Sequence, residues 1–498
     1  MERKLLHQQT KKWFYLKIDM VHSLEQIINL CSDVTNNSKE IKKGSLFLAL
    51  PGKTFDGRNY ISEAAKNGAS AIIYEKKDFK LKEQINIPHL GIENLHKKQG
   101  KIIKFFFKNP SKSIKIIGIT GTNGKTSVAG WLSQCLNILN CKTGTIGTLG
   151  CEISGKKIKT LNTTPDIISL SNMLNDAVNK ECEFIVLEVS SHAIQQKRID
   201  NIDFDLRILT NVSRDHLDYH KTIKKYQNIK KQFFLSDKRI KAIINVDDFI
   251  GREIIHEGAL ENHQFISYAI DRDADLKVKN IVYKNNKMIF DFLWEKNSYQ
   301  IKVNIHGKHN VYNLLGVIAS LLFYEFPMNK IIKAVENLES ISGRNEVVYY
   351  DNNGLPQIII DYAHTPDALE NILQSLGETE PSEIILIFGC GGNRDKGKRK
   401  QMALVASKYA DKVIVTNDNP RDENPRDILN AIEKNLSVNN EVIESRENAI
   451  KRGLMLVKKK GILLIAGKGH ENFQEIKGIK TPFSDKEVAL SNIGLVKN

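Results

Sequence analysis

The sequence contains few cysteines, and they are not grouped. Six cysteines are scattered over 498 residues without a short paired spacing, which argues against a disulfide framework or a cysteine-rich zinc site. The N-terminal residues lack the apolar core of a signal peptide, and the longest apolar stretch, "GVIASLLFY", is far shorter than a membrane span. We therefore expect a soluble, cytoplasmic protein without a membrane partner.

The sequence also lacks an arginine-rich arm and any interleaving of aromatic and basic residues, features that are typical of proteins that bind single-stranded nucleic acid. Its formal net charge is nevertheless +15. The lysines are spread along the whole chain, and an anionic small-molecule substrate explains this charge as well as nucleic acid does. We expect small-molecule substrates, no nucleic-acid partner and a monomer; a phosphate-loop ATPase stimulated by nucleic acid is the distant alternative.

The length exceeds what a single core usually supports and predicts about three domains of ~150 residues each. A linker-like stretch, "FFKNPSKS", precedes a strand-like run, and an alternation of strands and helices restarts near Ser342. These breaks predict domains at residues 1–108, 109–341 and 342–498. The expected fold class is α/β, with a small N-terminal α/β domain, a central phosphate-loop domain with a mostly parallel sheet, and a doubly wound C-terminal domain.

Strand-like runs occur in both of the larger domains. In the central part "EFIVLEV", "FDLRILT" and "KAIINV" alternate with helical segments, and in the C-terminal part "PQIIIDYA", "EIILIFG", "KVIVTN" and "GILLIAG" do the same. This is the pattern of a parallel sheet that helices cover on both faces. Polar or glycine-rich loops follow each C-terminal strand, at the end where open α/β sheets bind ligands.

The loop "TNDNPRDENP" follows one of these C-terminal strands. Its second half predicts the start of a helix, because Asn424 suits an N-cap and Pro425 suits the first helical position. The first half, Asp418 to Arg421, is not needed to start that helix. We therefore place these four residues on a ligand-binding rim.

The segment "GITGTNGKTS", residues 118–127, lies between a predicted strand and a predicted helix, which is the context that a phosphate-binding loop requires. Glycines let backbone N–H groups converge on phosphate oxygens, Lys125 supplies a positive charge, and the Thr126 hydroxyl can bind Mg²⁺. The spacing departs from the common pattern, since the first glycine is Gly118 and not residue 119. The residues expected to bind a nucleotide here are Gly121, Thr122, Asn123, Gly124, Lys125, Thr126 and Ser127.

Two further side chains are candidates for a Mg²⁺ site beside this loop. Glu188 ends the apolar run "FIVLE" and is expected at the same sheet edge, where its carboxylate would offer the hard oxygen that Mg²⁺ prefers. His216, in "NVSRDHLDYH", would be a second ligand or a phosphate contact. A solvated strand end for Glu188 and a structural role for His216 are the alternatives.

Several motifs occur in order along nearly the whole chain. They are "GTNGKTS", "NTTPD", "EVSSHAIQQKR", "NVSRDHLDYH", "GKHNVYN", "GRNE", "DYAHTPDAL", "FGCGGNRDKGKR", "DNPR" and "AGKGHE". Together they resemble the Mur ligases of peptidoglycan synthesis, in which the phosphate loop has this longer form. The resemblance implies an N-terminal domain that holds a uridine nucleotide, a central ATPase, and a C-terminal domain that carries the incoming amino acid.

The resemblance also implies substrate-binding residues at matching positions. The family's "DSR" reads "NSK" here, so we assign no contact to Asn37 or Lys39. The residues implied for the UDP-linked substrate are Ser38, Lys53, Thr54, Phe55, Asn162, Thr163, Thr164, Ser190, Gln196 and Arg198. Further nucleotide contacts are implied for Asn310, Arg344 and Asp361.

The family resemblance implies an unusual role for Lys230, which lies ten residues after His220. At this spacing the family places a lysine carbamylated by CO₂, and a carbamate would turn a cation into a carboxylate-like metal ligand. The implied catalytic set is Lys125, Glu188, His216 and Lys230, and the implied metal set replaces Lys125 by Thr126. From its sequence context alone, Lys230 would be a surface lysine among five.

The implied reaction forms an amide bond while ATP is hydrolysed to ADP and phosphate, with Mg²⁺ as cofactor. The D-glutamate carboxylate of a UDP-muramoyl-dipeptide would accept the γ-phosphoryl group, and the amine of meso-diaminopimelate would then attack. In family terms "DNPR" marks diaminopimelate users, and an arginine fork such as Arg421 binds a carboxylate with two parallel hydrogen bonds. Arg394, Gly467 and Glu471 would complete the pocket with residues 418–421.

Three alternatives to this reading stay open. A lysine-adding Mur ligase would have a similar architecture, and so would a folate-glutamate ligase. Arg421 could also cap a neighbouring element or pair with Asp422 without touching a substrate.

Overall fold

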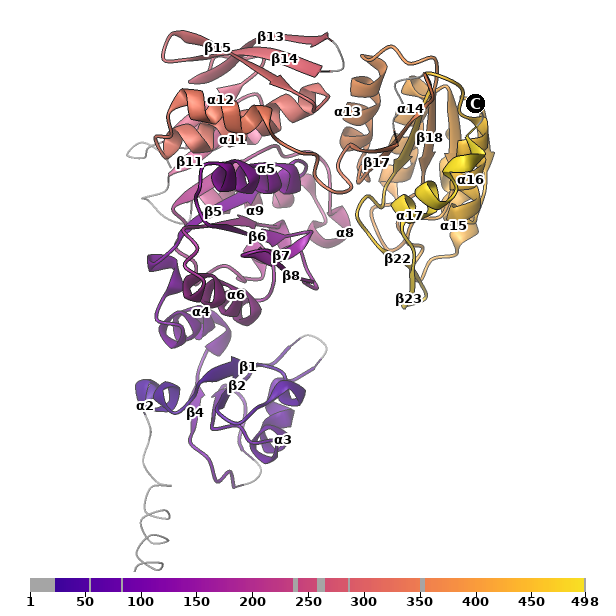
Figure 1. Cartoon of the computed structure of the whole chain (residues 1–498). Coiled ribbons are helices and arrows are strands. Elements are labelled where there is room, and N and C mark those ends of the chain that lie inside the picture. The colour runs from indigo at the N-terminus through magenta and orange to yellow at the C-terminus, as the bar shows by residue number, and fades with distance from the viewer. Residues whose placement is uncertain are drawn as a thin grey trace, which may run out of the picture. The chain divides into compact units, whose positions relative to one another are not determined.

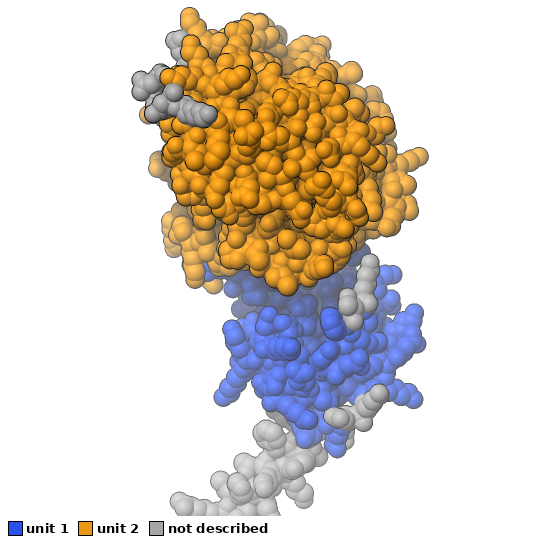
Figure 2. Space-filling view, turned by 90° about the vertical axis from the view of Figure 1, so that its right-hand side faces the viewer, with its two compact units in different colours: residues 1–112, 166–176, 197–202 blue, residues 113–165, 177–196, 203–498 orange. Residues whose placement is uncertain are grey.

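The structure is a computed structural model that describes residues 23–52, 55–81, 84–235, 241–257, 265–284, 287–349 and 354–496. This part of the chain forms two compact units (Figure 2). Unit 1 contains the described part of Met1–Lys112 with Asp166–Asp176 and Lys197–Ile202, and unit 2 contains Ser113–Pro165, Ala177–Gln196 and Asp203–Asn498. The domain boundaries at 108/109 and 341/342 stay a prediction. No described helix is both long and apolar enough to cross a bilayer.

Unit 1 is built on a four-stranded parallel sheet in the order β1-β2-β3-β4. Alternate residues of β2 face opposite sides, because side chains along a strand alternate between the two faces. Leu46 and Leu48 pack with one apolar cluster, and Phe47 packs with another. The elements are α2 (Leu24–Asn29), β1 (Asp33–Thr35), η1 (Ser38–Glu40), β2 (Ser45–Ala49), η2 (Gly57–Tyr60), α3 (Ile61–Lys66), β3 (Ala71–Glu75), β4 (His89–Ile92), α4 (Leu95–Phe106) and η3 (Pro110–Lys112).

The central sheet has eleven strands among the described residues, in the order β15-β14-β13-β12-β11-β10-β5-β9-β6-β7-β8. Its middle is parallel, as the sequence predicts, whereas the hairpins β6–β8 and β13–β15 extend both edges antiparallel. The strands are β5 (Lys115–Thr120), β6 (Thr143–Gly147), β7 (Gly150–Ile153), β8 (Lys156–Ile158), β9 (Phe184–Glu188), β10 (Leu206–Leu209), β11 (Ala242–Asn245), β12 (Phe265–Ala269), β13 (Leu276–Lys284), β14 (Lys287–Trp294) and β15 (Asn297–Val303).

Helices pack on this sheet (Figure 1). Most residues of the long apolar helix α11 (Lys308–Phe323) are buried. Because α11 is apolar around most of its circumference, it lies inside the core with α5 and one sheet face. The helices in this part of the chain are α5 (Lys125–Ile138), α6 (Ile167–Asn179), α7 (Ser191–Gln195), α8 (Leu217–His220), α9 (Ile223–Leu235), α10 (Phe249–His256), α11 (Lys308–Phe323) and α12 (Met328–Glu336). Residues 167–176 of α6 belong to unit 1, where Ile167 and Ile168 pack in an apolar cluster.

The C-terminal part of unit 2 holds a six-stranded sheet in the order β16-β17-β21-β18-β19-β20, parallel except for the edge strand β16. Apolar clusters cover both of its faces, as in a doubly wound fold. Its strands are β16 (Glu346–Tyr349), β17 (Gln357–Asp361), β18 (Ile384–Phe388), β19 (Lys412–Val415), β20 (Asn440–Val442) and β21 (Ile462–Ala466), with a separate hairpin β22 (Phe473–Ile476) and β23 (Ile479–Pro482). Its helices are α13 (Pro366–Gly377), α14 (Gly397–Tyr409), α15 (Pro425–Glu433), α16 (Arg446–Leu456), α17 (Asp485–Ser491) and η4 (Ile493–Leu495).

The loops at the carboxyl ends of these strands are tied together by backbone hydrogen bonds. Thr416 N donates to Phe388 O at 3.0 Å, and Gly467 N donates to Asp361 O at 3.0 Å. Asn424 caps α15 through its side chain, with Pro425 as the first residue, so the predicted helix start is confirmed. The four strands predicted in this domain are confirmed as well, and they bring the predicted ligand-binding loops to one edge of the sheet.

Candidate functional site

The phosphate loop occupies residues 121–124, between β5 and α5, where the sequence predicts it. Gly124 precedes the helix with φ +84°, a conformation that favours glycine. A Cβ atom on Gly121 would lie 1.8 Å from Thr210 Oγ1, and one on Gly124 would lie 2.2 Å from Asn313 Oδ1. Both positions therefore require glycine so that the loop backbone can approach its neighbours.

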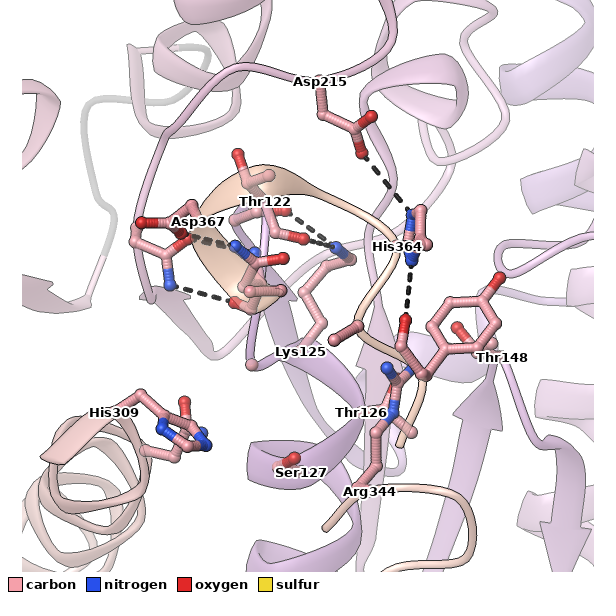
Figure 3. Close-up of a pocket in the computed structure, with 18 of the residues that line it drawn as sticks. Thr122, Lys125, Thr126, Ser127, Thr148, Asp215, His309, Arg344, His364 and Asp367 are labelled. Carbon is pink, nitrogen blue, oxygen red and sulfur yellow. Dashed lines mark hydrogen bonds and ion pairs between the residues drawn. The ribbon is translucent and has the colours of Figure 1, made fainter. Parts of the chain in front are cut away.

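Lys125 and Thr126 begin helix α5 and point toward the cavity described below (Figure 3). The Lys125 ammonium donates to the backbone oxygens of Gly121 at 2.8 Å and Thr122 at 2.9 Å, and burial lowers its pKa. The Thr126 hydroxyl donates to Glu188 Oε2 at 3.0 Å. The loop thus joins a cation and a hydroxyl at the positively polarised end of a helix.

Glu188 ends β9 beside the loop, because β9 pairs with β5 in a register that sets Glu188 opposite Ile119. It is only 2% exposed, so it is not a solvated strand end. Its carboxylate accepts hydrogen bonds from the Thr148 backbone N–H at 2.8 Å and the Thr148 hydroxyl at 3.0 Å. A Cβ atom on Gly147 would lie 2.2 Å from Glu188 Oε1, so the absence of a side chain there makes room for this carboxylate.

Lys230 is a buried residue of α9 and not a surface lysine. Its ammonium donates to Gly121 O at 2.7 Å and lies 4.9 Å from the centroid of the Tyr226 ring. Burial lowers the pKa of Lys230 well below its usual value, and the nearby charge of Lys125 lowers it further.

His216 and Asp215 lie on the loop before α8. Burial lowers the pKa of His216 to about 3, so its imidazole is neutral at physiological pH and keeps a lone pair. The Asp215 carboxylate lies 3.4 Å from His216 Nε2 and forms an ion pair with Lys398 of the C-terminal sheet domain at 3.3 Å. Figure 3 shows Asp215 directed at His364, whose Nε2 lies 3.9 Å away.

The residues implied as further nucleotide contacts also lie beside the loop. Arg344 Nη2 donates to Thr126 Oγ1 at 3.1 Å, and the guanidinium lies 4.3 Å from the centroid of the Tyr362 ring. Within the described chain, the buried Arg344 Nε has no hydrogen-bond partner. Asp361 accepts backbone N–H groups, and burial raises its pKa. Asn310 donates to His306 O at 2.8 Å.

A cavity of about 220 Å³ brings these side chains together. Every residue that the sequence assigns to catalysis or nucleotide binding lines it: Gly121, Thr122, Asn123, Gly124, Lys125, Thr126, Ser127, Glu188, His216, Lys230, Asn310, Arg344 and Asp361. Other residues that line the cavity were not predicted from the sequence: Thr148, Asn211, Asp215, Tyr226, Asn313, Tyr362, His364 and Asp367. Several of these stand within the quoted motifs, so proximity to a motif residue was the available signal.

Part of the donor set at this cavity suits Mg²⁺. No group of three His, Cys, Asp or Glu side chains suited to a metal occurs in the described residues. The Thr126 hydroxyl and the Glu188 carboxylate nevertheless offer two adjacent hard oxygens, which suits an ion that keeps several waters. An ammonium cannot ligate a metal, so Lys230 would join this set only as a carbamate.

The residues implied for the UDP-linked substrate are divided between the two units. Ser38, Phe55 and Arg198 belong to unit 1, and Asn162, Thr163, Thr164, Ser190 and Gln196 belong to unit 2. Lys53 and Thr54 lie outside the described residues. Among the described residues of this set, only Thr163 and Ser190 line the cavity. Thr164 is fully buried and donates to Glu188 O at 2.7 Å.

The residues implied for the amino-acid pocket gather at the carboxyl ends of β18, β19 and β21. A Cβ atom on Gly391 would lie 2.8 Å from Arg421 Nη1 and 3.7 Å from Arg394 Cγ, so the two arginines flank one glycine. Asn419 donates a hydrogen bond to Glu471 Oε2 at 2.8 Å. A Cβ atom on Gly467 would lie 2.8 Å from Asp418 Oδ2. Pro420 lies in the same loop, beside Gly392.

Arg421 is held by its neighbours at both backbone and side chain. Its guanidinium donates to Gly392 O at 2.8 Å and pairs with Glu475 at 3.5 Å. Its backbone N–H donates to Glu475 O at 3.0 Å, and its carbonyl accepts from Lys477 N at 2.7 Å, which joins the loop to the hairpin β22–β23. The partners of Arg421 therefore include the hairpin, a contact that the sequence does not predict.

Three family models match the chain. They are the Mur ligase family catalytic domain over residues 32–106, the Mur ligase middle domain over residues 119–321, and the Mur ligase glutamate ligase domain over residues 343–469. The chain belongs to the Mur ligase family. The resemblance inferred from the motifs is thereby confirmed, and so is the α/β fold class in three domains.

Known proteins related to this Mur ligase match it over nearly their whole length. The UDP-N-acetylmuramoyl-L-alanyl-D-glutamate–2,6-diaminopimelate ligase 2 of Clostridium acetobutylicum is 40% identical over 468 residues, covering 93% of this chain and 95% of that protein. The corresponding ligase of Coxiella burnetii is 38% identical over 471 residues, covering 92% of this chain and 95% of that protein.

Solved structures of ligases resemble this Mur ligase in fold. The structure of a UDP-N-acetylmuramoyl-L-alanyl-D-glutamate–2,6-diaminopimelate ligase has a TM-score of 0.67 and 29% identity, covering 93% of this chain and 95% of the other. The MurF ligase of Thermotoga maritima, solved in complex with ADP, has a TM-score of 0.66 and 19% identity, covering 93% and 97%. The second likeness supports the fold alone.

We predict that Gly147→Ala displaces the Glu188 carboxylate, because the new methyl group would overlap it. Mg²⁺ should raise the affinity of the wild type for the nucleotide, and we expect this increase to be at least about tenfold smaller in the variant. Loss of a residue that supports a metal ligand typically has an effect of this size. Titration calorimetry with a non-hydrolysable ATP analogue, with and without Mg²⁺, measures this. Gly377→Ala is the matched control, since a Cβ atom there meets open space; equal behaviour of the two variants would contradict the assignment of Glu188.

Proposed function

We propose that this Mur ligase joins meso-diaminopimelate to UDP-N-acetylmuramoyl-L-alanyl-D-glutamate while ATP is hydrolysed to ADP and phosphate, in the synthesis of a peptidoglycan precursor. The observation that carries this proposal is the "DNPR" loop, which sets Arg421 beside Arg394 at the open edge of the C-terminal sheet. The names of the relatives that match over nearly their whole length support it. The cytoplasmic location and the monomeric state expected from the sequence belong to the same proposal.

The chemistry begins with a carboxylate, which is a poor electrophile. Transfer of the γ-phosphoryl group to the D-glutamate side-chain carboxylate gives an acyl phosphate, and attack by the amine then forms the amide and releases phosphate. Phosphoryl transfer needs positioning and charge neutralisation more than a nucleophilic side chain. The chain offers the loop N–H groups, the Lys125 ammonium and the free Arg344 Nε–H for this purpose.

Mg²⁺ held by Thr126 and Glu188, with His216 near, would neutralise negative charge on the phosphate oxygens. The neutral imidazole of His216 keeps a lone pair that can bind a metal or accept a hydrogen bond. We assign Asn310, Arg344 and Asp361 to the nucleotide because they line the same cavity as the loop. This arrangement accounts for the chemistry without a covalent enzyme intermediate.

We propose that Lys230 is carbamylated in the active enzyme. A buried ammonium beside Lys125 is unfavourable, and its lowered pKa leaves an amine that is neutral more often than a surface lysine would be. Only the neutral amine adds to CO₂. The resulting carbamate would replace one of two buried positive charges by a negative one and supply oxygen ligands at the cavity that Thr126 also lines.

Each end of the UDP-linked substrate has its own candidate residues. We assign the uridine end to Ser38, Lys53, Thr54 and Phe55 of the N-terminal domain, and the muramoyl-dipeptide to Asn162, Thr163, Thr164, Ser190, Gln196 and Arg198. Phe55 is 72% exposed, so its ring is available to a ligand. Thr163 and Ser190 on the cavity wall support a dipeptide end that reaches the phosphate site.

We assign the amino-acid pocket to Arg394, Asp418, Asn419, Pro420, Arg421, Gly467 and Glu471. Diaminopimelate differs from lysine by a carboxylate on the distal carbon of its side chain. An arginine fork can bind that carboxylate with two hydrogen bonds, and Glu471 can balance the distal ammonium. The Glu471 carboxylate is already held in place by Asn419 and by the fully buried Lys468 at 3.1 Å, which orients it before a substrate arrives.

We predict that only meso-diaminopimelate is added at a substantial rate when the protein is incubated with ATP, Mg²⁺, the UDP-dipeptide and a panel of amino acids. A site with buried groups that await a partner can reject the analogue lacking it by roughly 10⁴ to 10⁵ fold. Mass spectrometry of the products measures this. Comparable addition of lysine would contradict the diaminopimelate assignment, and ATP hydrolysis stimulated by DNA or RNA would favour the nucleic-acid alternative.

We predict that Arg421→Ala lowers kcat/KM for meso-diaminopimelate about 30- to 150-fold. This corresponds to the loss of one charge-assisted pair worth about 2 to 3 kcal/mol. Steady-state kinetics at saturating ATP and UDP-dipeptide measure it, with the exposed Arg426→Ala as control. An unchanged Michaelis constant for diaminopimelate in the Arg421 variant would indicate that this arginine only fastens the loop to Gly392 and Glu475.

We predict that Lys230→Ala loses nearly all ligase activity and that short carboxylic acids such as formate or acetate restore part of it. A small acid can occupy the space of the missing carbamate and supply its oxygens. The exposed Lys225→Ala, on the same helix, is the control and should behave like the wild type with and without added acid. Loss of activity without any rescue would count against the carbamate.

A further inference from the structure

Three ion pairs join the loop and helix at residues 214–218 to the segment 394–398 of the C-terminal sheet domain. Arg214 pairs with Asp395 at 3.0 Å, Asp215 pairs with Lys398 at 3.3 Å, and Asp218 pairs with Arg394 at 3.5 Å. The first segment contributes one positive and two negative side chains and the second contributes one negative and two positive ones, so the two segments are complementary in charge. We call these six residues the docking strip.

Only the Asp215–Lys398 pair of the docking strip has both side chains buried. The side chains of Lys398 and Asp215 are 9% and 7% exposed, whereas Arg214 and Arg394 are each nearly half exposed. Exposed ion pairs contribute little because solvent screens them. A buried carboxylate that loses its partner is strongly disfavoured. The Asp215–Lys398 pair is therefore the contact of the docking strip whose loss has the largest effect.

The Asp215 carboxylate also holds the neighbouring His216. Its Oδ1 accepts the His216 backbone N–H at 2.9 Å and the Lys398 ammonium at 3.3 Å, while Oδ2 lies 3.4 Å from His216 Nε2. His216 has φ +53°, a left-handed conformation that is uncommon for a residue with a side chain. The backbone at His216 is thus fixed from one side by the same oxygen that Lys398 approaches from the other.

His216 in turn lines the cavity that contains Lys125 and Glu188. The path from the C-terminal sheet domain to the phosphate site therefore needs only three residues: Lys398, Asp215 and His216. His364 also faces Asp215, with its Nε2 3.9 Å from Asp215 Oδ2. His364 comes from the same C-terminal domain as Lys398, in the loop after β17.

We propose that Lys398 is a positioning residue for phosphoryl transfer: contact between the domains places its ammonium on Asp215, which fixes His216 at the wall of the phosphate cavity. The inference rests on the proposed ligase function. It makes correct placement of His216 depend on the domain that carries the incoming amino acid. ATP would then be used efficiently only when that domain is in contact with the central one.

A direct role of Lys398 in binding the amino acid is the competing explanation. The two roles differ in their kinetic effects. A residue that contacts the amino acid raises its KM when removed, whereas a residue that orients the phosphate site lowers kcat. Misplacement of a catalytic group by about 1 Å can lower the rate by roughly 100-fold.

The test compares Lys398→Met with Lys400→Met, an exposed lysine two residues further along α14. We expect kcat of the Lys398 variant to fall about 10- to 100-fold, with KM for ATP and meso-diaminopimelate within about threefold of wild type. Lys398→Arg, which retains the charge, should recover part of the rate. Equal kcat in the two methionine variants, or a change confined to KM for the amino acid, would overturn the proposal.

A double-mutant cycle with Asp215→Asn checks the pairing itself. If Lys398 acts through Asp215, the double variant should be no less active than the less active of the two single variants. Additive losses would contradict the proposal. Asp215→Asn also serves if Lys398→Met does not fold. If the wild type forms no amide product, the proposed function fails. The Asp215–Lys398 pair is then tested by urea unfolding of the full chain, where a coupling free energy of zero between the two substitutions would overturn the pairing.

Discussion

The hydrogen bond between Thr126 and Glu188 connects the two strands and the helix on which the phosphate site is built. It exists because β9 pairs with β5 in a register that ends the two strands together, and because helix α5 begins at the next turn of the chain. A shift of that register by one residue would turn the Glu188 side chain to the opposite face of the sheet. The buried apolar residues on both faces of β5 and β9 oppose such a shift, so the core of the domain fixes a contact in the active site.

The site also concentrates positive charge that a protein interior does not normally accept. Lys125 and Lys230 both donate to the backbone oxygen of Gly121, and neither is held by a carboxylate at hydrogen-bond distance in the described hydrogen bonds. Groups of this kind are stable when an anion lies among them. The arrangement thus has the electrostatic character of a site that is complete only with phosphate, and the buried Arg344 Nε–H adds a donor of the same kind.

Much of this molecule follows from local patterns. The phosphate loop, the four predicted C-terminal strands and the cap of α15 depend on neighbouring residues in sequence, and all of them occur where the patterns predict. The antiparallel hairpins on the edges of the central sheet were not expected, because strands such as β8 are short, exposed and weakly apolar. Their pairing depends on the sheet already formed by their neighbours.

In the candidate site, too, the features that depend on residues distant in sequence could not be predicted. Every predicted catalytic residue lines the cavity, since each belongs to a motif with its own chemistry. Burial was harder to foresee: Glu188 and Lys230 are charged residues whose environment comes from segments far away in sequence. The Thr148 bonds to Glu188 span 40 residues and the Lys398 bond to Asp215 spans 183, and no pattern within either segment points to the other.

The backbone bonds between Arg421 and the hairpin β22–β23 bear on how substrate choice can change within such a family. The guanidinium is aimed by a turn whose left-handed φ of +52° is stabilised by residues 475 and 477, more than fifty positions later in the chain. Residues 418–421 and the hairpin thus form a single structural unit. If the loop were transferred into a relative with a different hairpin, the arginine would lack the backbone contacts that orient its guanidinium. A change of substrate specificity in this architecture is therefore expected to require paired changes in two distant segments.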